Sequence, residues 1–503
     1  MRNKQNNFLI NYGFKLISNL LTVIIGFITT AIVPKTLGAS NYGIFSYLTD
    51  VLTKIFALFD LRSSTYFYIK YSQNTRDKYF LSFYFLYAIS ISSLFTLVII
   101  LIKITPIGDL IFENISLKII LVGLLYVLFF WFQDIFTKLM DAIGETKKVE
   151  IFKIIGRIVG LILLLSLFFT TNLNLFTYFF YSISVVFISI LSAYVFLKPN
   201  LRKVLKYSSL RFRYFFEKQF DYISPLFIYL LVGTFIAIFD RWFLQKIGGS
   251  IEQGYYGFAF LLSNIILIFL TSLLPLYTKE LSTQNGNKSK MKDVFLLYTP
   301  IIFTFVAFIC CFCSVFSEDL ILIFADEGYL GAEQTIKIMF FYPLVSTFSN
   351  MSGTVIYTTN RTKIFRNLIL IFGPIHILLL VLLISKDFGY GLGATGLAIK
   401  QVSIESLSVV IILLLNSRYL KFSLKNFILK ISIIIIIFYG ISSLIYSIDF
   451  LPFNSIYFEF ITKGFLYTCI CLILIFIFPE IFGLNKSISA KIKEKLKNIY
   501  QNK

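Results

Sequence analysis

The chain has 503 residues, of which 57% are hydrophobic and only 14% are charged, and its mean hydropathy is +0.82. About one quarter of a soluble domain is charged, so this composition excludes an ordinary soluble fold. The formal net charge of +20 indicates either nucleic acid or a membrane surface as a partner, depending on where the cations lie.

Apolar segments long enough to cross a bilayer recur along the chain, since about 20 apolar residues span a hydrocarbon core of about 30 Å. The first segment is too long for a cleaved signal peptide and is expected to remain a helix. The predicted fold is an all-α polytopic membrane protein with about fourteen transmembrane helices. They fall at residues 8–33, 43–66, 80–104, 118–140, 150–170, 175–197, 220–245, 254–277, 293–317, 334–359, 367–385, 393–417, 428–447 and 456–478.

Lys and Arg gather in alternate loops, which predicts the orientation. If the N-terminus is cytoplasmic, the cytoplasmic segments hold 33 of the 46 Lys and Arg residues, seven of them in residues 198–218. By the positive-inside rule, both termini are expected in the cytoplasm. The cations then face the anionic lipid head groups of the cell membrane, and nucleic acid is not expected as a partner.

Two motifs recur at nearly the same offset. Tyr42-Gly43 and Tyr256-Gly257 each follow a Gly-containing turn, 214 residues apart, and Thr146-Lys147 recurs 216 residues later as Thr362-Lys363. Parallel repeats are therefore predicted: two pseudo-symmetric six-helix lobes and two extra C-terminal helices. The predicted segments are an N-terminal lobe (1–197), a basic cytoplasmic linker (198–219), a C-terminal lobe (220–418), an extra helix pair (419–478) and a basic cytoplasmic tail (479–503).

Cations inside the predicted spans are candidates for binding an anionic substrate. Inserting such a cation into the membrane costs about 2.5–3.5 kcal/mol, so a cation in this position indicates a functional role. Two alternatives stay open: cations near span ends can reach the head groups, and Lys54 can pair with Asp50 at i, i+4. The candidates, in order of preference, are Lys15, Lys54, Arg157 and Lys400, then Arg62 and Arg241.

Intramembrane acids are candidates for a coupling-ion site that takes H⁺ or Na⁺. They are Asp50, Asp134 and Glu405. At the repeat offset, Asp50 corresponds to Asn264 and Asp134 to Asn350, and an amide takes up no proton at neutral pH. The coupling site is therefore predicted in the first half of the chain.

No metal site, other cofactor or catalytic residue is predicted. The five cysteines lie inside apolar runs and His376 is the only histidine. A Cys-x-Cys pair on a helix does not converge on one metal ion. Every extramembrane segment is short, so an enzyme with a large external domain is not expected.

The chain resembles the polysaccharide biosynthesis flippases, of the O-antigen repeat-unit type, in the multidrug/oligosaccharidyl-lipid/polysaccharide exporter superfamily. The residues that carry this resemblance are Pro34–Gly38 through Tyr42–Ser46, and Asp240-Arg241 followed by a Gly-rich turn and Tyr256-Gly257. The resemblance implies two six-helix lobes around a central cavity. It also implies a polyprenyl-pyrophosphate-linked oligosaccharide as substrate, moved by ion-coupled alternating access.

The resemblance further implies that the two extra helices form a groove for the lipid tail. Polysaccharide polymerase or assembly proteins would be partners, beside the substrate and membrane lipids. Three alternatives stay open. They are a drug or organic-cation antiporter of the same superfamily, an integral-membrane glycan transferase or polymerase, and a scaffold subunit of an assembly complex.

Overall fold

The computed structural model describes residues 2–75, 77–113, 115–204, 212–223, 227–448 and 455–483. Within these ranges, the side chains of residues 2–17, 19–20, 196–204, 212, 221–223, 229 and 271–272 lie outside the description. The described residues form helices and turns without a strand, because a helix pairs its own backbone groups where lipid offers no partner. Two compact units, Met1–Gly257 and Phe258–Lys503, are described separately.

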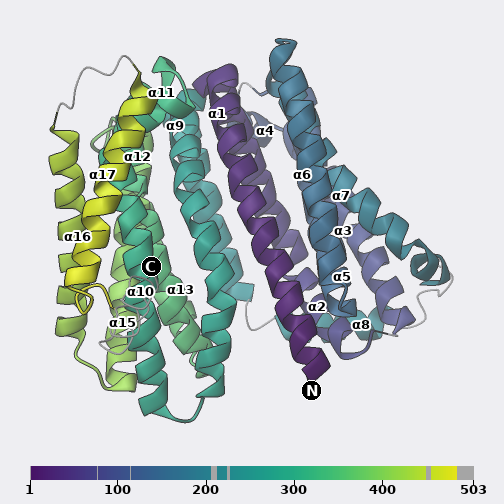
Figure 1. The fold of residues 1–503 in the computed structure, drawn as a ribbon. Coiled ribbons are helices and arrows are strands. Elements are labelled where there is room, and N and C mark those ends of the chain that lie inside the picture. Colours follow the sequence, from purple (N-terminus) through teal and green to yellow (C-terminus); the bar gives the residue numbers. More distant parts are fainter. Residues whose placement is uncertain are drawn as a thin grey trace, which may run out of the picture. The chain divides into compact units, whose positions relative to one another are not determined.

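Unit 1 is a helix bundle in which α5, α6 and α7 pack against one another and α6 packs on α1 (Figure 1). Gly156 and Gly160 of α6 leave no room for a side chain beside Val185 of α7, so the two helices approach closely. The helices of unit 1 are α1 (Arg2–Asp60), α2 (Ser63–Gln73), α3 (Lys78–Ile104), α4 (Pro106–Ile111), α5 (Leu117–Ile143), α6 (Thr146–Phe169), α7 (Leu175–Val204), α8 (Phe212–Ile223) and the first part of α9 (Phe227–Thr283).

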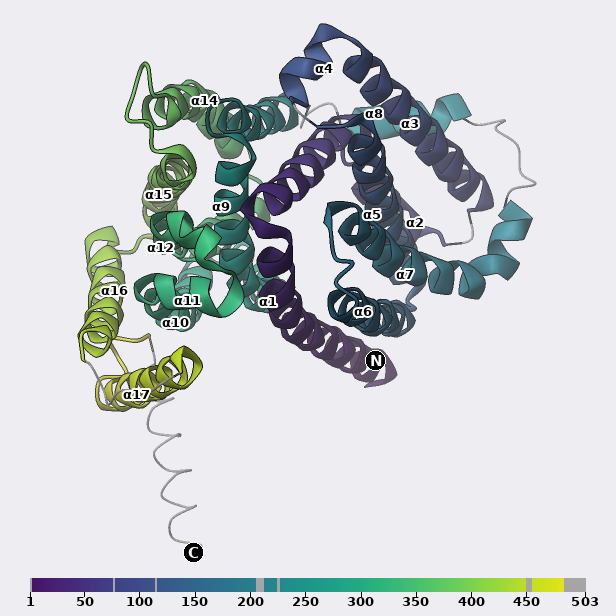
Figure 2. The same ribbon diagram turned by 90° about the horizontal axis from the view of Figure 1, so that it is seen from above.

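Unit 2 begins inside α9 at Phe258. Its helices are the rest of α9, α10 (Lys288–Val315), α11 (Ser317–Phe324), the 3₁₀ turn η2 (Glu327–Ala332), α12 (Glu333–Met339), α13 (Tyr342–Thr358), α14 (Lys363–Ile384), α15 (Gly393–Leu420), α16 (Leu424–Tyr446) and α17 (Ile456–Ile477). The last two helices contact α10 and lie at the edge of the unit (Figure 2).

Eleven helices of the described chain are long and apolar enough to span a membrane. Two of them, within α1 and α9, cover 40 and 41 residues and are kinked. Gly38 (φ 71°, ψ 167°) and Gly249 (φ 70°, ψ −167°) interrupt the helical backbone in a region that only glycine adopts readily. The multi-pass class is therefore confirmed, and the count of fourteen spans stays a prediction.

The two turns that carry the Thr-Lys motif have the same backbone hydrogen bonds. Glu145 N donates to Met140 O at 2.9 Å, and Arg361 N donates to Ile356 O at 3.0 Å, which is the same pair 216 positions later. Gly144 (φ 89°) and Asn360 (φ 56°) precede these donors in left-handed conformations, as a helix C-terminal cap requires. The sequence offset thus corresponds to a shared local structure.

The boundary between the units falls inside α9, whereas the sequence analysis places the lobe boundary near residue 219. The reason is that the first part of α9 packs on α1. A Cβ added at Gly43 would overlap the carbonyl oxygen of Ser250, and one added at Gly254 would overlap that of Ala39. The backbone segments that follow the two kinks therefore contact each other at these glycines. The segment boundaries given by the sequence analysis remain predictions.

Candidate functional site

One carboxylate on α1 binds two cations inside unit 1. Asp50 Oδ2 lies 2.7 Å from Lys54 Nζ, one turn later on α1, and 2.7 Å from Arg241 Nε on α9. Lys54 Nζ also donates to the carbonyl oxygen of Ala237 at 3.3 Å. The carboxylate of Asp50 therefore has two cationic partners, one on α1 and one on α9.

Arg241 is held by further neutral partners. Its Nη1 donates to Gln253 Oε1 at 2.8 Å and its Nη2 to Ser46 Oγ at 3.2 Å, and its guanidinium lies 4.7 Å from the centre of the Tyr256 ring. Gln253 Nε2 returns a hydrogen bond to the carbonyl oxygen of Arg241 at 2.5 Å. We call Ser46, Asp50, Lys54, Arg241 and Gln253 the Asp50 cluster.

The Asp50 cluster is buried on one side and accessible on the other. The side chain of Arg241 is 5% exposed, whereas those of Asp50 and Lys54 are 28% and 29% exposed. Arg241 is therefore fixed, because its fork of donors is engaged on three sides. Lys54 is the cation of this cluster that a ligand can reach.

A second polar cluster joins α1, α2 and α5 of unit 1. Lys138 Nζ donates to Asp134 Oδ2 at 2.6 Å and to Ser64 Oγ at 2.8 Å. Ser63 Oγ donates to Asp60 Oδ1 at 2.6 Å, and the charge of Lys138 acts on Asp60 as well. Two carboxylates share one ammonium, so this Asp134 cluster (Asp60, Ser63, Ser64, Asp134 and Lys138) carries one unit of excess negative charge.

The other predicted cations of unit 1 lie apart from these clusters. Arg157 of α6 is half-buried, and its Nη1 lies 3.2 Å from the carbonyl oxygen and 3.4 Å from the Oγ of Ser18. Arg62 is exposed in the turn between α1 and α2. The side chain of Lys15 lies outside the described residues. Arg157 is therefore hydrogen-bonded to the neutral oxygens of Ser18, and the charge of the buried Glu150 on α6 also acts on it.

In unit 2, Lys400 of α15 has an exposed fraction of 0% and lies close enough to His376 of α14 for their charges to interact. Glu405 is half-buried and hydrogen-bonded to Gln401 and Ser349. Glu405 is five positions after Lys400, so the two side chains leave α15 in different directions. With no exposed surface, Lys400 cannot contact a ligand in this conformation.

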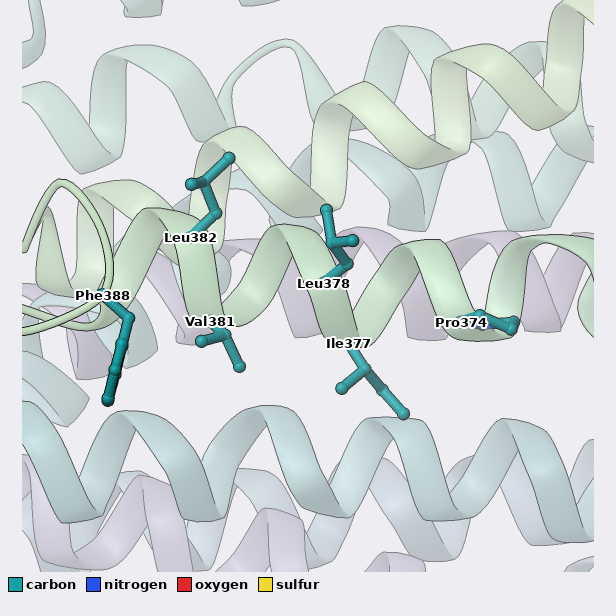
Figure 3. Close-up of a pocket in the computed structure, with 6 residues that line it drawn as sticks. All are labelled: Pro374, Ile377, Leu378, Val381, Leu382 and Phe388. Atoms are coloured by element: carbon teal, nitrogen blue, oxygen red, sulfur yellow. The ribbon is translucent and has the colours of Figure 1, made fainter.

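The larger pockets described do not suit a charged head group. A pocket of 630 Å³ on α14 is lined only by apolar side chains, and Figure 3 shows Ile377, Val381 and Phe388 pointing to one side of the helix. A pocket of 600 Å³ between α3 and α5 adds only the hydroxyls of Ser92, Ser93 and Thr96. Among the described residues, no group of three His, Cys, Asp or Glu side chains could hold a metal ion.

The structure thus brings three of the predicted site residues together: Asp50, Lys54 and Arg241. The sequence analysis missed Ser46 and Gln253, although both lie within the motif segments that follow the kinks. It also missed the role of Lys138, for which the i, i+4 spacing from Asp134 is a readable signal.

Most of the chain is similar in fold to two solved transporters. The lipid II flippase MurJ, in an inward closed conformation, has a TM-score of 0.67 and 18% identity over 92% of this chain and 98% of that chain. An inward-facing multidrug resistance transporter of the MATE family and MOP superfamily has a TM-score of 0.58 and 13% identity over 82% of this chain and 98% of that chain. No family model and no curated protein matches the sequence.

The helices and these neighbours define a multi-pass membrane protein with a transporter fold. The particular fold is similar to those of MurJ and of a MATE transporter of the MOP superfamily, the superfamily that the sequence motifs resemble. Both neighbours are transporters rather than enzymes. At these identities the similarity concerns the fold, so the substrate must be argued from the site.

Proposed function

We propose that the protein is a flippase that moves a polyprenyl-pyrophosphate-linked oligosaccharide from the cytoplasmic to the outer leaflet for surface polysaccharide synthesis. The observation that carries the proposal is the Asp50 cluster, where two cations meet one carboxylate within membrane-spanning helices. That one structural neighbour is a lipid II flippase supports a lipid-linked substrate.

Cations within a span favour an anionic head group. A pyrophosphate loses hydration when it leaves water, and fixed cations in a medium of low dielectric constant offset that loss. Lys54 supplies the accessible ammonium, and Arg157 supplies a half-buried guanidinium that is hydrogen-bonded to Ser18. Lys15 completes the proposed set.

Alternating access is the proposed mechanism, with two duplicated six-helix lobes moving about their junction. The shared hydrogen bonds at Glu145 and Arg361 and the paired kinks at Gly38 and Gly249 support the duplication. The MurJ match covers a tenth more of the chain than the MATE match, a difference comparable to the combined length of α16 and α17. This supports an added helix pair, which we propose contacts the lipid tail.

A coupling ion, H⁺ or Na⁺, is proposed at the Asp134 cluster. Asp50 is held by two cations and is a poor site for a third, whereas Asp60 and Asp134 share one ammonium. Glu405 in unit 2 has hydroxyl and amide partners and stays the second choice. Both termini are proposed to be cytoplasmic in the cell membrane, and polysaccharide polymerase or assembly proteins are proposed partners.

The proposal is tested by reconstituting the full chain in liposomes with a fluorescent polyprenyl-pyrophosphate oligosaccharide and quenching the label from outside. We expect protein-dependent exchange between leaflets that slows at least tenfold in Lys54→Gln. The control is Lys103→Gln, because Lys103 lies at the end of α3 and pairs with the exposed Asp109. In cells, a deletion strain should strand the lipid-linked oligosaccharide on the cytoplasmic leaflet. Full-rate exchange without the protein, or none with it, would refute the proposal.

A drug or organic-cation antiporter is the second candidate. The Asp134 cluster favours the antiporter, because the excess negative charge of this cluster suits a cationic substrate. The MATE neighbour also supports the antiporter. The same liposomes loaded with an organic cation dye distinguish the two. Dye efflux without lipid exchange supports the antiporter, and the reverse result supports the flippase. An integral-membrane transferase is less favoured, because no acidic pair in the described loops stands out as catalytic.

A further inference from the structure

A pocket of 370 Å³ lies in unit 1 where α2, the α2–α3 turn and α8 meet. Its base is aromatic: Phe215 of α8 packs on Phe80 of α3 with ring centres 5.3 Å apart, and Tyr66 of α2 lies 6.0 Å from Phe80. All three side chains are buried. Pockets of this size accept small organic groups, and the aromatic base offers a face against which a polyol can pack.

The rim of the pocket is cationic. Lys70 of α2 and Lys218 of α8 line it, both are exposed, and neither forms an ion pair with any described residue. The one acid in the lining, Asp77, is engaged, because its Oδ1 accepts the backbone N–H of Phe80 at 2.9 Å as the N-cap of α3. Two cations therefore face the opening, and an anion can bind there without displacing an existing ion pair.

Helix α8 has the character of an interfacial helix. It is not among the candidate spans, yet Tyr214, Phe216 and Phe220 are 55%, 45% and 56% exposed. The charged side chains Arg213 and Glu217 are also exposed and pair with each other at 2.9 Å. A short helix with exposed aromatics and charges lies at the boundary between head groups and acyl chains. The pocket beneath α8 then opens at the level of lipid phosphates.

The positive-inside analysis supports the same location. It assigns residues 66–80 and 198–218 to the cytoplasmic face, and the pocket brings Lys70 of the first segment and Lys218 of the second to one opening. Anionic lipids are held on that face by Lys and Arg near the membrane surface. The positive charge of the rim therefore lies on the side of the membrane where anionic lipids are predicted to meet it.

We propose that this pocket binds the phosphate-bearing head group of an anionic membrane lipid, with the phosphate on Lys70 and Lys218 and the polyol against the aromatic base. The site is separate from the Asp50 cluster and holds a resident lipid rather than transported cargo. A soluble phosphate offers the same chemistry, and the experiment separates the two sources.

The test measures adducts on the purified full chain by native mass spectrometry in detergent, titrated with phosphatidylglycerol, phosphatidylcholine or inorganic phosphate. We expect phosphatidylglycerol to bind about tenfold more weakly to the double variant Lys70→Gln/Lys218→Gln, as loss of charge-assisted hydrogen bonds predicts. Phosphatidylcholine should bind weakly, and equally, to the wild type and to the double variant. Lys363→Gln/Arg366→Gln is the matched control, because both residues are exposed cations of unit 2 in a predicted cytoplasmic loop.

Competition by millimolar inorganic phosphate that displaces the lipid from the wild type but not from the variant would support a phosphate site. Phosphate binding without lipid binding would support the site and overturn the lipid as occupant. Equal phosphatidylglycerol binding by wild type, control and double variant would overturn the proposal. Tyr214→Ala, at an exposed lining residue, provides a second measurement and should weaken the lipid without weakening inorganic phosphate.

Discussion

Arg241 Nε lies 2.7 Å from Asp50 Oδ2, although the two residues are 191 positions apart in the chain. This contact joins the second segment of α1 to the first part of α9. A guanidinium that is 5% exposed needs a partner, because removing one member of a buried ion pair leaves an uncompensated charge. The pair therefore holds the second segment of α1 against the first part of α9, and it places a cation beside the carboxylate of the site.

Asp50→Asn is predicted to destabilise the protein more than Arg241→Gln does. The Asn variant leaves Lys54 and Arg241 facing each other without a counter-ion, and breaking a buried pair costs about 3–5 kcal/mol, less here because Asp50 is 28% exposed. Arg241→Gln leaves the neutral Asp50–Lys54 pair. The measurement is the thermal unfolding midpoint of each variant in detergent.

The double variant Asp50→Asn/Arg241→Gln supplies the control for this pair. Because it removes both charges, its loss of stability should be smaller than the sum of the two single losses, with a coupling of about 0.5–3 kcal/mol. Strictly additive losses would show that the two side chains do not stabilise each other.

The part of the site that sequence predicts is the part set by helix periodicity. Asp50 and Lys54 stand four residues apart, a spacing that predicts a pair on one helix face, and the 2.7 Å contact confirms this pair. Arg241 is a candidate for substrate binding in the sequence analysis, near the end of a predicted span where a cation can reach the head groups, and in the structure it is buried against Asp50. No local pattern could predict this, because the pairing depends on how α9 packs on α1.

Hydropathy predicts the helices but not the direction in which a single side chain points. Residues 8–33 and 43–66 are predicted as separate spans, and α1 is indeed two helical segments that meet at the kink at Gly38. Lys400 was expected to line a cavity, and its exposed fraction is 0%. Length and composition fix whether a segment can cross a membrane, whereas the direction of one side chain depends on neighbours that hydropathy does not encode.

Gly43→Ala and Gly254→Ala are predicted to destabilise unit 1. A Cβ at Gly43 would overlap the carbonyl oxygen of Ser250 and lie 2.7 Å from the backbone N of Gly254. These neighbours are backbone atoms that cannot rotate away, so the helices must separate, at a cost of about 1–3 kcal/mol. Thermal unfolding measures the loss, and slowed lipid exchange in liposomes would follow if this contact is the junction about which the lobes move.

Gly26→Ala is the matched control on the same helix, since an added Cβ there meets no atom within 4 Å. Replacing a helical glycine by alanine typically stabilises by about 0.4–1 kcal/mol. Equal behaviour of the Gly26 and Gly43 variants would contradict the close backbone contact.

Asp134→Asn and Asp60→Asn are predicted to remove the dependence of transport on an ion gradient. Each substitution leaves one carboxylate with Lys138, so the excess negative charge that would hold H⁺ or Na⁺ is lost. The rate of lipid exchange should then be the same with and without an imposed gradient of H⁺ or Na⁺. Asp109→Asn, at an 82% exposed carboxylate, should keep the wild-type response. Full gradient dependence in both cluster variants would move the coupling site elsewhere.

Asp319 of α11 is predicted to make stability depend on pH. It lies outside the candidate spans, and burial raises the pKa of its carboxyl from 3.8 to about 6, with Lys463 opposing this shift and Glu459 and Glu318 adding to it. The folded state therefore holds the proton more tightly than the unfolded chain. The free energy of unfolding falls as the pH rises from about 4 to about 6, and the cost persists above that range.

Asp319→Asn removes this cost, so the variant should exceed the wild type in stability above about pH 6 by about 1 kcal/mol, a value reduced for the partial exposure of the carboxyl. The difference should vanish near pH 4, where the wild-type carboxyl is protonated in both states. Thermal unfolding midpoints in detergent between pH 4 and 8 measure it, with Asp387→Asn at an exposed loop carboxylate as control. A variant less stable than the wild type above pH 6 would instead mean that attraction between Asp319 and Lys463 outweighs burial, and that the carboxylate stabilises this end of unit 2 in its charged form.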